Sequence, residues 1–291
     1  MYHVILNENY VKSKKAKRKF DDVLRVFEQA GKPYTVHRTA NKESVRSVTA
    51  EITSGAGNCV VAVGGDGTLH DVLNGFKNFK DNFLGLIPFG TGNDFAATAG
   101  IPLDVKKAAE IIIADKSRPI DFIQLGNGLR SINAIGMGLD VDVLKRAYAG
   151  KNKGKSKYFQ ALIVSLAKFK SCGFTVRYNG VEEKHYGLST AVGNGRQIGG
   201  GIKLFPEAKP DDGMLNLLIC EYVSKIGIIG AFLKLMTGRV NKVKQVTAVQ
   251  TDKVTFIPHD ENYTIQADGE LYENIPLDIR VSDEKLNFFM N

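Results

Sequence analysis

Strand-like runs alternate with amphipathic helical patterns over the first 125 residues of the chain. The run at 59–63 is entirely apolar, which predicts a strand buried on both faces. Successive strand-helix units imply an α/β domain whose parallel, Rossmann-like sheet is covered by helices. The predicted strands are 2–6, 33–37, 59–63, 83–87 and 119–125, and the predicted helices are 12–30, 42–53, 68–76 and 102–114.

The pattern changes after about residue 126, where short strand-like segments punctuated by glycine dominate. They predict a second, mostly antiparallel β domain with helical insertions at about 140–170 and 224–238. We therefore expect one domain at residues 1–125 and another at 126–281, with residues 282–291 returning to the first. The expected strands of the second domain are 131–136, 174–178, 186–192, 214–221, 245–257 and 263–267.

Composition restricts the class of protein. The chain has 291 residues, of which 43% are hydrophobic and 24% charged, as in soluble two-domain proteins. Its longest apolar stretches are too short to span a bilayer, so we do not expect an integral membrane protein. Its three cysteines form no CxxC pair and lie in apolar surroundings, so we expect free thiols in a reducing cytoplasm. The net charge of +8 favours an anionic partner such as a nucleotide or a lipid surface. No nucleic-acid motif is present, so no nucleic-acid partner is expected, and the sequence leaves a homodimer open.

Three glycines separate the buried run at 59–63 from the helical pattern at 68–76. Gly64, Gly65 and Gly67 let a ligand approach the backbone, because they carry no Cβ. A strand that ends in glycines and opens a helix presents unpaired N–H groups and a positive dipole end, which favour an anion. Neither a Walker loop nor a GxGxxG fingerprint occurs, but we expect this turn to bind phosphate.

An acidic residue, Asp66, lies among these glycines, and Thr68 follows them. A carboxylate repels a polyphosphate unless a divalent cation lies between the two, so the GGDGT turn predicts a nucleotide together with Mg²⁺. The alternative interpretation is that Asp66 is an ordinary turn or cap residue.

A second turn of this kind, GTGNDFA at residues 90–96, follows the strand at 83–87. It combines glycines with a hydroxyl from Thr91, an amide from Asn93 and an acid from Asp94. The ends of parallel strands meet at one edge of the sheet, where ligands bind. Two such turns therefore strengthen the prediction of a phosphate site.

Two further turns contain acidic residues. In Asp268-Gly269-Glu270, Glu270 is placed to accept a proton from an attacking hydroxyl if the turn faces the nucleotide; otherwise this is a plain Asp-Gly hairpin. The PDDG sequence at 210–213 is good turn chemistry, although one carboxylate with neighbouring carbonyls can also hold a hard cation. Three carboxylates, those of Asp66, Asp94 and Asp121, can supply a metal network for phosphoryl transfer, directly or through water.

These motifs, with PEAKPDDGML at 206–215, follow one another in an order that resembles the bacterial diacylglycerol kinase-like lipid kinases. GGDGT alone is shared with NAD kinases. The resemblance implies an ATP- and Mg²⁺-dependent kinase in which an N-terminal α/β domain and a C-terminal β-sandwich domain flank a cleft. The substrate it implies is a lipid met at the membrane surface, most simply diacylglycerol.

The resemblance also implies roles for individual residues. Glu270 is similar to the general base, and Asp66, Asp94 and Asp121 to the acidic network around a catalytic Mg²⁺ that Asp66 and Asp121 hold through water. A structural Mg²⁺ would lie at Asp212 and the carbonyls of Lys209 and Met214. The residues implied for nucleotide binding are Asn7, Thr39, Gly64, Gly65, Asp66, Gly67, Thr68, Thr91 and Asn93.

The chain departs from the family pattern in two places. The turn after the first strand is Asn7-Glu8-Asn9-Tyr10-Val11, where only Asn7 matches, and His70-Asp71 replaces an Asn-Glu pair. The changes leave open a catalytically silent nucleotide-binding regulator, and the GGDGT turn leaves open a kinase for NAD or another soluble metabolite. Five apolar residues flanked by basic ones are either helix core or a lipid-entry lip: Ile226, Ile229, Phe232, Leu233 and Leu235.

Overall fold

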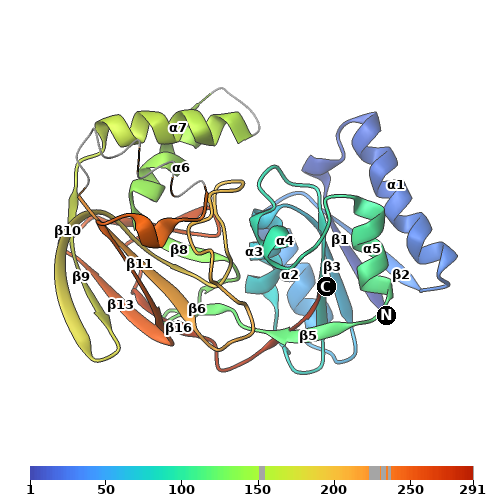
Figure 1. Cartoon of the computed structure of the whole chain (residues 1–291). Coiled ribbons are helices and arrows are strands. Elements are labelled where there is room, and N and C mark those ends of the chain that lie inside the picture. The colour runs from blue at the N-terminus through green and yellow to red at the C-terminus, as the bar shows by residue number, and fades with distance from the viewer. Residues whose placement is uncertain (151–154, 223–229, 231–233, 235–236, 291) are drawn as a thin grey trace. The chain divides into compact units, whose positions relative to one another are not determined.

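The computed structural model describes residues 1–150, 155–222, 230, 234 and 237–290. The chain divides into two compact units (Figure 1). Unit 1 combines Met1–Asp121 with Asp283–Asn291, and unit 2 is Phe122–Ser282. Within the described ranges, no helix combines the length and the apolar character needed to cross a membrane.

Unit 1 contains a six-stranded sheet in the order β2-β1-β3-β4-β17-β5. All pairs are parallel except β17 with β5, which confirms the predicted α/β fold with a parallel sheet. The central strand β3 is buried along its whole length, as its apolar run requires. The strands are β1 (Tyr2–Asn7), β2 (Tyr34–Thr39), β3 (Cys59–Gly64), β4 (Phe83–Pro88), β5 (Ser117–Ile120) and β17 (Leu286–Phe289).

Helices cover both faces of this sheet. α1 packs against α5, and α2 packs against α3 (Figure 1). Side-chain caps define where three of them begin, because Ser13, Asn41 and Asp104 each accept a hydrogen bond from a backbone N–H of the first turn. The helices are α1 (Lys14–Gln29), α2 (Lys42–Thr53), α3 (Asp66–Gly75), α4 (Asp94–Thr98) and α5 (Val105–Ile113), with a 3₁₀ turn, η1 (Glu8–Tyr10), after β1.

The predicted single strand at 119–125 is wrong. The chain instead forms β5 in the first sheet and β6 (Ile123–Leu125) in the second, with Asp121 between them. β5 pairs with β17, and β6 pairs with β16. Residues 120–123 are all fully buried, Asp121 included, so no exposed turn marks the point where the chain passes from one sheet to the other.

Unit 2 contains an eleven-stranded sheet whose pairs are all antiparallel, which confirms the predicted antiparallel β fold. Its core is formed by the inward-facing apolar residues of these strands. The strands after β6 are β7 (Arg130–Ser131), β8 (Ala134–Gly138), β9 (Cys172–Tyr178), β10 (Val181–Gly193), β11 (Leu215–Glu221), β12 (Val246–Thr251), β13 (Lys253–Pro258), β14 (Thr264–Ala267), β15 (Glu270–Glu273) and β16 (Asp278–Val281).

Two of the strands predicted in unit 2 each correspond to two separate strands in the structure. The expected strand at 131–136 is divided between β7 and β8, and the one at 245–257 between β12 and β13. β15 and β16, of four residues each, were not predicted. The insertion expected at 140–170 is helical, as α6 (Leu139–Ala149) and α7 (Lys155–Lys168), whereas most of the one at 224–238 lies outside the described residues. A second 3₁₀ turn is η2 (Val240–Lys242).

Candidate active site

The ends of four parallel strands bring the predicted nucleotide-binding residues of unit 1 to one edge of the sheet. Asn7 at the end of β1 is in register with Thr39 at the end of β2. On the other side, Leu6 pairs with Val63, and Gly64 pairs with Pro88 at the end of β4. Residues 7, 39, 64 and 88 therefore end their strands along one line, and the two glycine turns begin there.

The two glycine turns touch each other through their backbones. A Cβ on Gly90 would lie 2.5 Å from the Cα of Gly65, and a Cβ on Gly65 would lie 2.9 Å from the Cα of Gly90. The N–H of Phe89 also donates a 2.8 Å hydrogen bond to the carbonyl of Gly64. The two turns are therefore in direct contact, which only glycine permits at these positions. This contact supports the prediction that both turns form one site.

Asp66 links the same two turns. It is the first residue of α3, and its Oδ1 accepts a 3.2 Å hydrogen bond from the N–H of Phe95 in the first turn of α4. The alternative of a capping residue is therefore realised in part, because Asp66 caps the neighbouring helix. The N-cap residue of its own helix is Gly65, which supplies no side-chain cap. The N-terminus of α3 thus keeps N–H groups that no capping side chain has claimed, as an anion site requires.

Two buried oxygen atoms at these turns, the Thr68 hydroxyl and Asn93 Oδ1, have no hydrogen-bond partner among the described residues. Thr68 folds back so closely that a Cβ on Gly64 would lie 2.3 Å from its Oγ1. Asn93 has a positive φ of 53°, and its amide N–H₂ donates a hydrogen bond to the carbonyl of Gly90. Buried polar atoms are normally paired, so these two fit a site completed by a polar ligand.

The remaining predicted residues of unit 1 differ in exposure. Thr91 and Gly67 are accessible, whereas Thr39 is buried and donates its hydroxyl to the carbonyl of Leu6. The side chain of Asn7 accepts a hydrogen bond from the N–H of Asn9 and so shapes the turn after β1. Thr39 and Asn7 therefore stabilise the ends of their strands. Their polar groups are already engaged in hydrogen bonds, so they are less available to a ligand than the glycine turns are.

The three aspartates of the predicted metal network do not form one cluster. Asp94 is buried and directly precedes Phe95, whose N–H donates a hydrogen bond to Asp66. Asp94 and Asp66 therefore lie close together. Asp121 is fully buried and forms an ion pair with Lys285. Within the described residues, no three His, Cys, Asp or Glu side chains gather closely enough to hold a metal ion. One or two carboxylates suffice for Mg²⁺ when phosphates and water supply the other ligands, and Asp66 fits that arrangement.

The two departures from the family pattern have different structural consequences. Tyr10 lies against the first glycine turn, because a Cβ on Gly65 would be 3.0 Å from its hydroxyl. This residue was not predicted to belong to the site. His70 is fully buried, and Asp71 forms an ion pair with Arg46 of α2, at 2.9 Å. The change at 70–71 therefore affects the packing of α3 on α2.

In unit 2, Asp268 and Gly269 form a two-residue hairpin turn between β14 and β15. Both have positive φ, 52° and 88°, as a type I′ turn requires. The Asp268 carboxylate accepts four hydrogen bonds, from the Ser131 hydroxyl and the N–H groups of residues 132, 133 and 134, at 2.6–3.1 Å. The plain-hairpin alternative is therefore correct for Asp268, and Glu270 follows it as the first residue of β15, partly exposed.

Three more side chains fix this turn from outside the predicted motif. Gln266 accepts a 3.1 Å hydrogen bond from the N–H of Gly269, and Tyr148 of α6 donates one to the carbonyl of Gly269. Gln266 and Ser189 also hydrogen-bond the buried carboxyl group of Asp140. Burial raises the pKa of Asp140 to about 6, against the opposing effect of these hydrogen bonds. The backbone beside Glu270 is thus held on both sides by a connected polar network.

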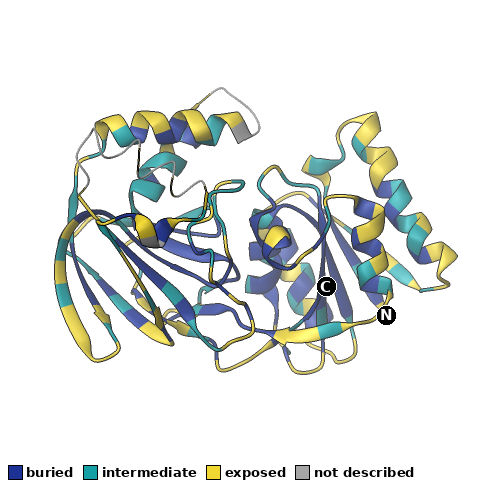
Figure 2. Cartoon of the chain, in the orientation of Figure 1, coloured by how far each residue is buried: buried dark blue, intermediate teal, exposed yellow. Residues whose placement is uncertain are grey.

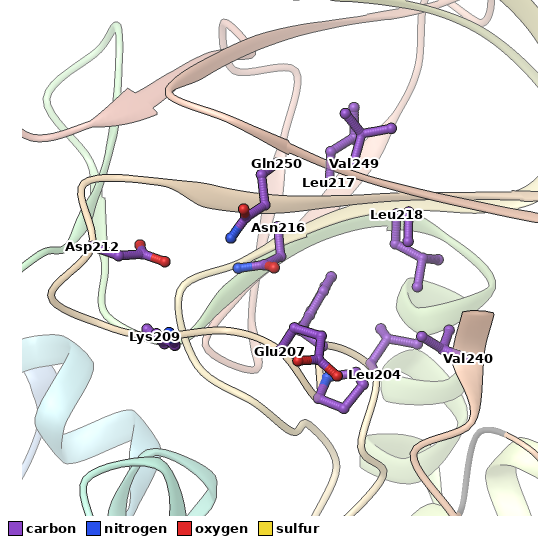
Figure 3. Close-up of a pocket in the computed structure, with 13 residues that line it drawn as sticks. Leu204, Glu207, Lys209, Asp212, Asn216, Leu217, Leu218, Val240, Val249 and Gln250 are labelled. Carbon is purple, nitrogen blue, oxygen red and sulfur yellow. The ribbon is translucent and has the colours of Figure 1, made fainter.

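The predicted structural Mg²⁺ residues lie in an open loop of unit 2. The Oδ1 of Asp212 accepts a 3.0 Å hydrogen bond from the N–H of Met214, as turn chemistry predicts. Lys209 and Asp212 also line a cavity of about 440 Å³ (Figure 3). The amide groups of Asn216 and Gln250 point toward the Asp212 side of it. An amide can present either its oxygen or its nitrogen, so this set of groups is compatible with a hard cation.

The proposed lipid-entry lip cannot be placed. Its five apolar members, Ile226, Ile229, Phe232, Leu233 and Leu235, lie outside the described residues.

Comparisons with known proteins agree with this arrangement. Residues 1–125 match the family model described as "Diacylglycerol kinase catalytic domain", and residues 133–290 match "YegS C-terminal NAD kinase beta sandwich-like domain". A diacylglycerol kinase of Bacillus subtilis (strain 168) is 29% identical over 89% of this chain and 86% of its own length. A "Probable lipid kinase YegS-like" of Xanthomonas campestris pv. campestris (strain 8004) is 30% identical over 84% and 82%.

Solved structures show the same fold. A diacylglycerol kinase from Bacillus anthracis str. Sterne covers 100% of this chain with a TM-score of 0.76 at 18% identity, with 96% of that chain included. An NAD kinase from Archaeoglobus fulgidus in complex with ATP also covers 100% of this chain and 94% of its own, with a TM-score of 0.57 at 14% identity.

The paired glycine turns and the antiparallel second unit, with these matches, define a lipid kinase. The chain belongs to the diacylglycerol kinase-like family of lipid kinases that includes the YegS-like proteins.

Proposed function

We propose that this kinase transfers the γ-phosphoryl group of ATP to the hydroxyl of diacylglycerol and so produces phosphatidic acid, in a reaction that requires Mg²⁺. The observation that carries the proposal is the contact between the glycine turns at Gly65 and Gly90. It makes one backbone cradle from two loops, beside the N-terminus of α3 and two unpartnered polar oxygens. A polyphosphate satisfies each of these features.

In this proposal the residues of unit 1 bind and orient the nucleotide. The N–H groups at the start of α3 donate to phosphate oxygens, and the Thr68 hydroxyl gains the partner that it lacks. Asp66 is the residue placed to hold Mg²⁺, with Asp94 beside it. Bound there, the cation would neutralise phosphate charge, which is the main electrostatic demand of phosphoryl transfer.

Glu270 would take the proton of the acceptor hydroxyl. Its carboxylate belongs to a strand that starts directly after a rigid turn, so its backbone position varies little. A base must be held within hydrogen-bond distance of the proton it removes, and the network of Asp268, Gln266 and Tyr148 supplies that rigidity.

The experiment is an assay of radiolabelled phosphate transfer from ATP. We expect labelled phosphatidic acid from diacylglycerol in vesicles, with activity lost when EDTA removes Mg²⁺ and restored by added Mg²⁺. NAD is the comparison substrate, because the soluble-metabolite alternative predicts labelled NADP without any lipid. Labelling of sphingoid bases or polyprenols but not of diacylglycerol would retain the lipid kinase and reject the proposed substrate.

A further inference from the structure

Two histidines that are far apart in the sequence meet on the sheet of unit 1. His3 belongs to β1 and His37 to β2, and the parallel register pairs His3 with Thr35 and Ile5 with His37. Alternate residues of a strand share a face, so the two imidazoles lie diagonally on one face of the sheet. The Nδ1 atom of His3 lies 3.1 Å from the Nε2 atom of His37. Because 34 residues separate the two histidines, no sequence spacing indicated this contact.

A small ligand can reach this pair from solvent. β2 is the edge strand, and its residues are mostly exposed or half-buried, whereas β1 and β3 beside it are mainly buried (Figure 2). Both histidines are half-buried. The two rings are therefore accessible, and the backbone that carries them is fixed by the pairing of β1 with β2.

The surroundings of His3 leave one of its ring nitrogens available as an electron-pair donor. Asn58 donates its amide N–H₂ to the carbonyl of Ile52, at 2.9 Å, and so keeps its oxygen for the hydrogen bond that it forms with His3. A metal-bound histidine typically donates its other ring N–H to an oxygen of this kind, which fixes the tautomer. Burial and the neighbouring His37 lower the pKa of His3, so its ring is uncharged at neutral pH. The uncharged imidazole is the form that binds a metal ion.

The distance between the two nitrogens fits a shared metal ion. Metal–nitrogen bonds of about 2.0–2.1 Å that meet at a tetrahedral angle hold their nitrogens about 3.3–3.4 Å apart, close to the observed 3.1 Å. Small rotations of the half-buried rings suffice to direct both lone pairs at one point. Within the described residues no third His, Cys, Asp or Glu joins the pair, so water would complete the coordination.

We propose that His3 and His37 form a two-imidazole site for a divalent transition metal ion such as Zn²⁺. Imidazole nitrogens bind Zn²⁺, Cu²⁺ and Ni²⁺, whereas Mg²⁺ and Ca²⁺ prefer oxygen ligands. The ion would link the edge strand β2 to β1. Asn7, at the end of β1 that faces the glycine turns, is about 13 Å further along the strand than His3, so the site is separate from the nucleotide site and does not depend on the proposed function.

Calorimetric titration with Zn²⁺ tests the proposal. Tag-free protein is stripped of metals with EDTA and then kept in excess Mg²⁺, which occupies sites built from oxygen. We expect one Zn²⁺ per chain and binding that is at least tenfold weaker in His37→Gln, with thermal melting to show that the variant folds. His259→Gln is the matched control and should bind as the parent does, because His259 is an exposed histidine of unit 2 that bonds Thr175.

Two results of this titration overturn the proposal. Equal affinity of His37→Gln and the parent would leave the pair as a plain hydrogen bond, in which one imidazole carries the proton. Half an equivalent of Zn²⁺ per chain would identify an ion shared between two copies of the protein.

Cu²⁺ provides a spectroscopic test that counts the imidazoles. Electron paramagnetic resonance with less than one equivalent of Cu²⁺ should show hyperfine splitting from two equivalent nitrogens in the parent and from one at most in His37→Gln. His3→Gln should cause the same loss, because each substitution removes one of the two ligands. A single nitrogen in the parent, or a parent-like spectrum from His3→Gln, would reject the shared ion.

Discussion

The carboxylates near the hairpin turn of unit 2 show how one residue type takes different roles in different surroundings. Asp268 is buried under four hydrogen bonds and shapes the turn, whereas Glu270 is partly exposed beyond it. The sequence predicted Glu270 as the candidate base, because the Asp-Gly-Glu motif is local. Asp140 and Tyr148 were not predicted, since more than 100 residues separate them from the turn. Only the packing of α6 brings them there.

The first prediction concerns Glu270. Glu270→Gln keeps the shape of the side chain but cannot accept a proton, so we expect kcat to fall about 10²- to 10⁴-fold, the usual contribution of a general base. The KM for ATP should change little, because the nucleotide is bound by the turns of unit 1. Steady-state kinetics with each substrate varied separately will measure both. A loss confined to the KM for ATP would contradict the proposed role.

The second prediction concerns Asp140, whose pKa burial raises from 3.8 to about 6. A carboxyl group with a raised pKa favours the fold while it is protonated, and this contribution is lost as pH rises from about 4 to 6. Asp140→Asn stays uncharged at every pH. Relative to the parent, its free energy of unfolding should therefore improve with pH across that window, by up to about 3 kcal/mol. Urea denaturation at pH 4 and pH 7 measures the difference; a difference independent of pH would exclude this titration.

The strand and helix elements were predictable where their burial is uniform. The run at Cys59–Gly64 is apolar throughout because β3 is covered on both faces, and the glycines after it indicated the turn. Prediction failed at residues 119–125, where two strands of different sheets follow each other with only the buried Asp121 and Phe122 between them.

The third prediction concerns the contact between the glycine turns. Gly90→Ala places a methyl group 2.5 Å from the Cα and 3.3 Å from the N of Gly65, and these backbone atoms cannot move aside as a side chain would. We expect a loss of stability of about 1–3 kcal/mol and loss of the thermal stabilisation that ATP gives the parent. Gly55→Ala is the matched control, because its Cβ would meet no atom closer than 3.5 Å. Thermal melting with and without ATP measures both effects; an ATP shift retained by Gly90→Ala would place the nucleotide elsewhere.

At the scale of the whole molecule, unit 1 is discontinuous in sequence. Its strand β17 comes after all of unit 2 and pairs with β4 and β5. Leu286, Phe288 and Phe289 are fully buried there, and Lys285 neutralises the buried Asp121. Residues 1–125, which match a family model, therefore do not contain all the strands of their sheet.

The fourth prediction follows from that arrangement. Removal of residues 283–291 takes three large side chains from the core of unit 1, each worth about 2–5 kcal/mol, against a typical total stability of about 5–15 kcal/mol. We expect unit 1 to unfold and unit 2 to remain folded. Hydrogen exchange resolved by peptide will show rapid exchange in β1, β3 and β4 and protection in β9 and β10. A shorter truncation, of residues 290 and 291 only, serves as the control; protection of β3 in the longer truncation would show that β17 is dispensable.

Strand β17 also has a consequence for biosynthesis. Domains usually fold in the order in which the ribosome releases them. Here the strands that present the glycine turns are synthesised before unit 2, whereas their partner strand β17 is synthesised after it. While residues 122–282 are being translated, β4 has an open edge that only later receives Leu286–Phe289. A nascent chain should therefore acquire its ability to bind nucleotide only after its second unit has already emerged.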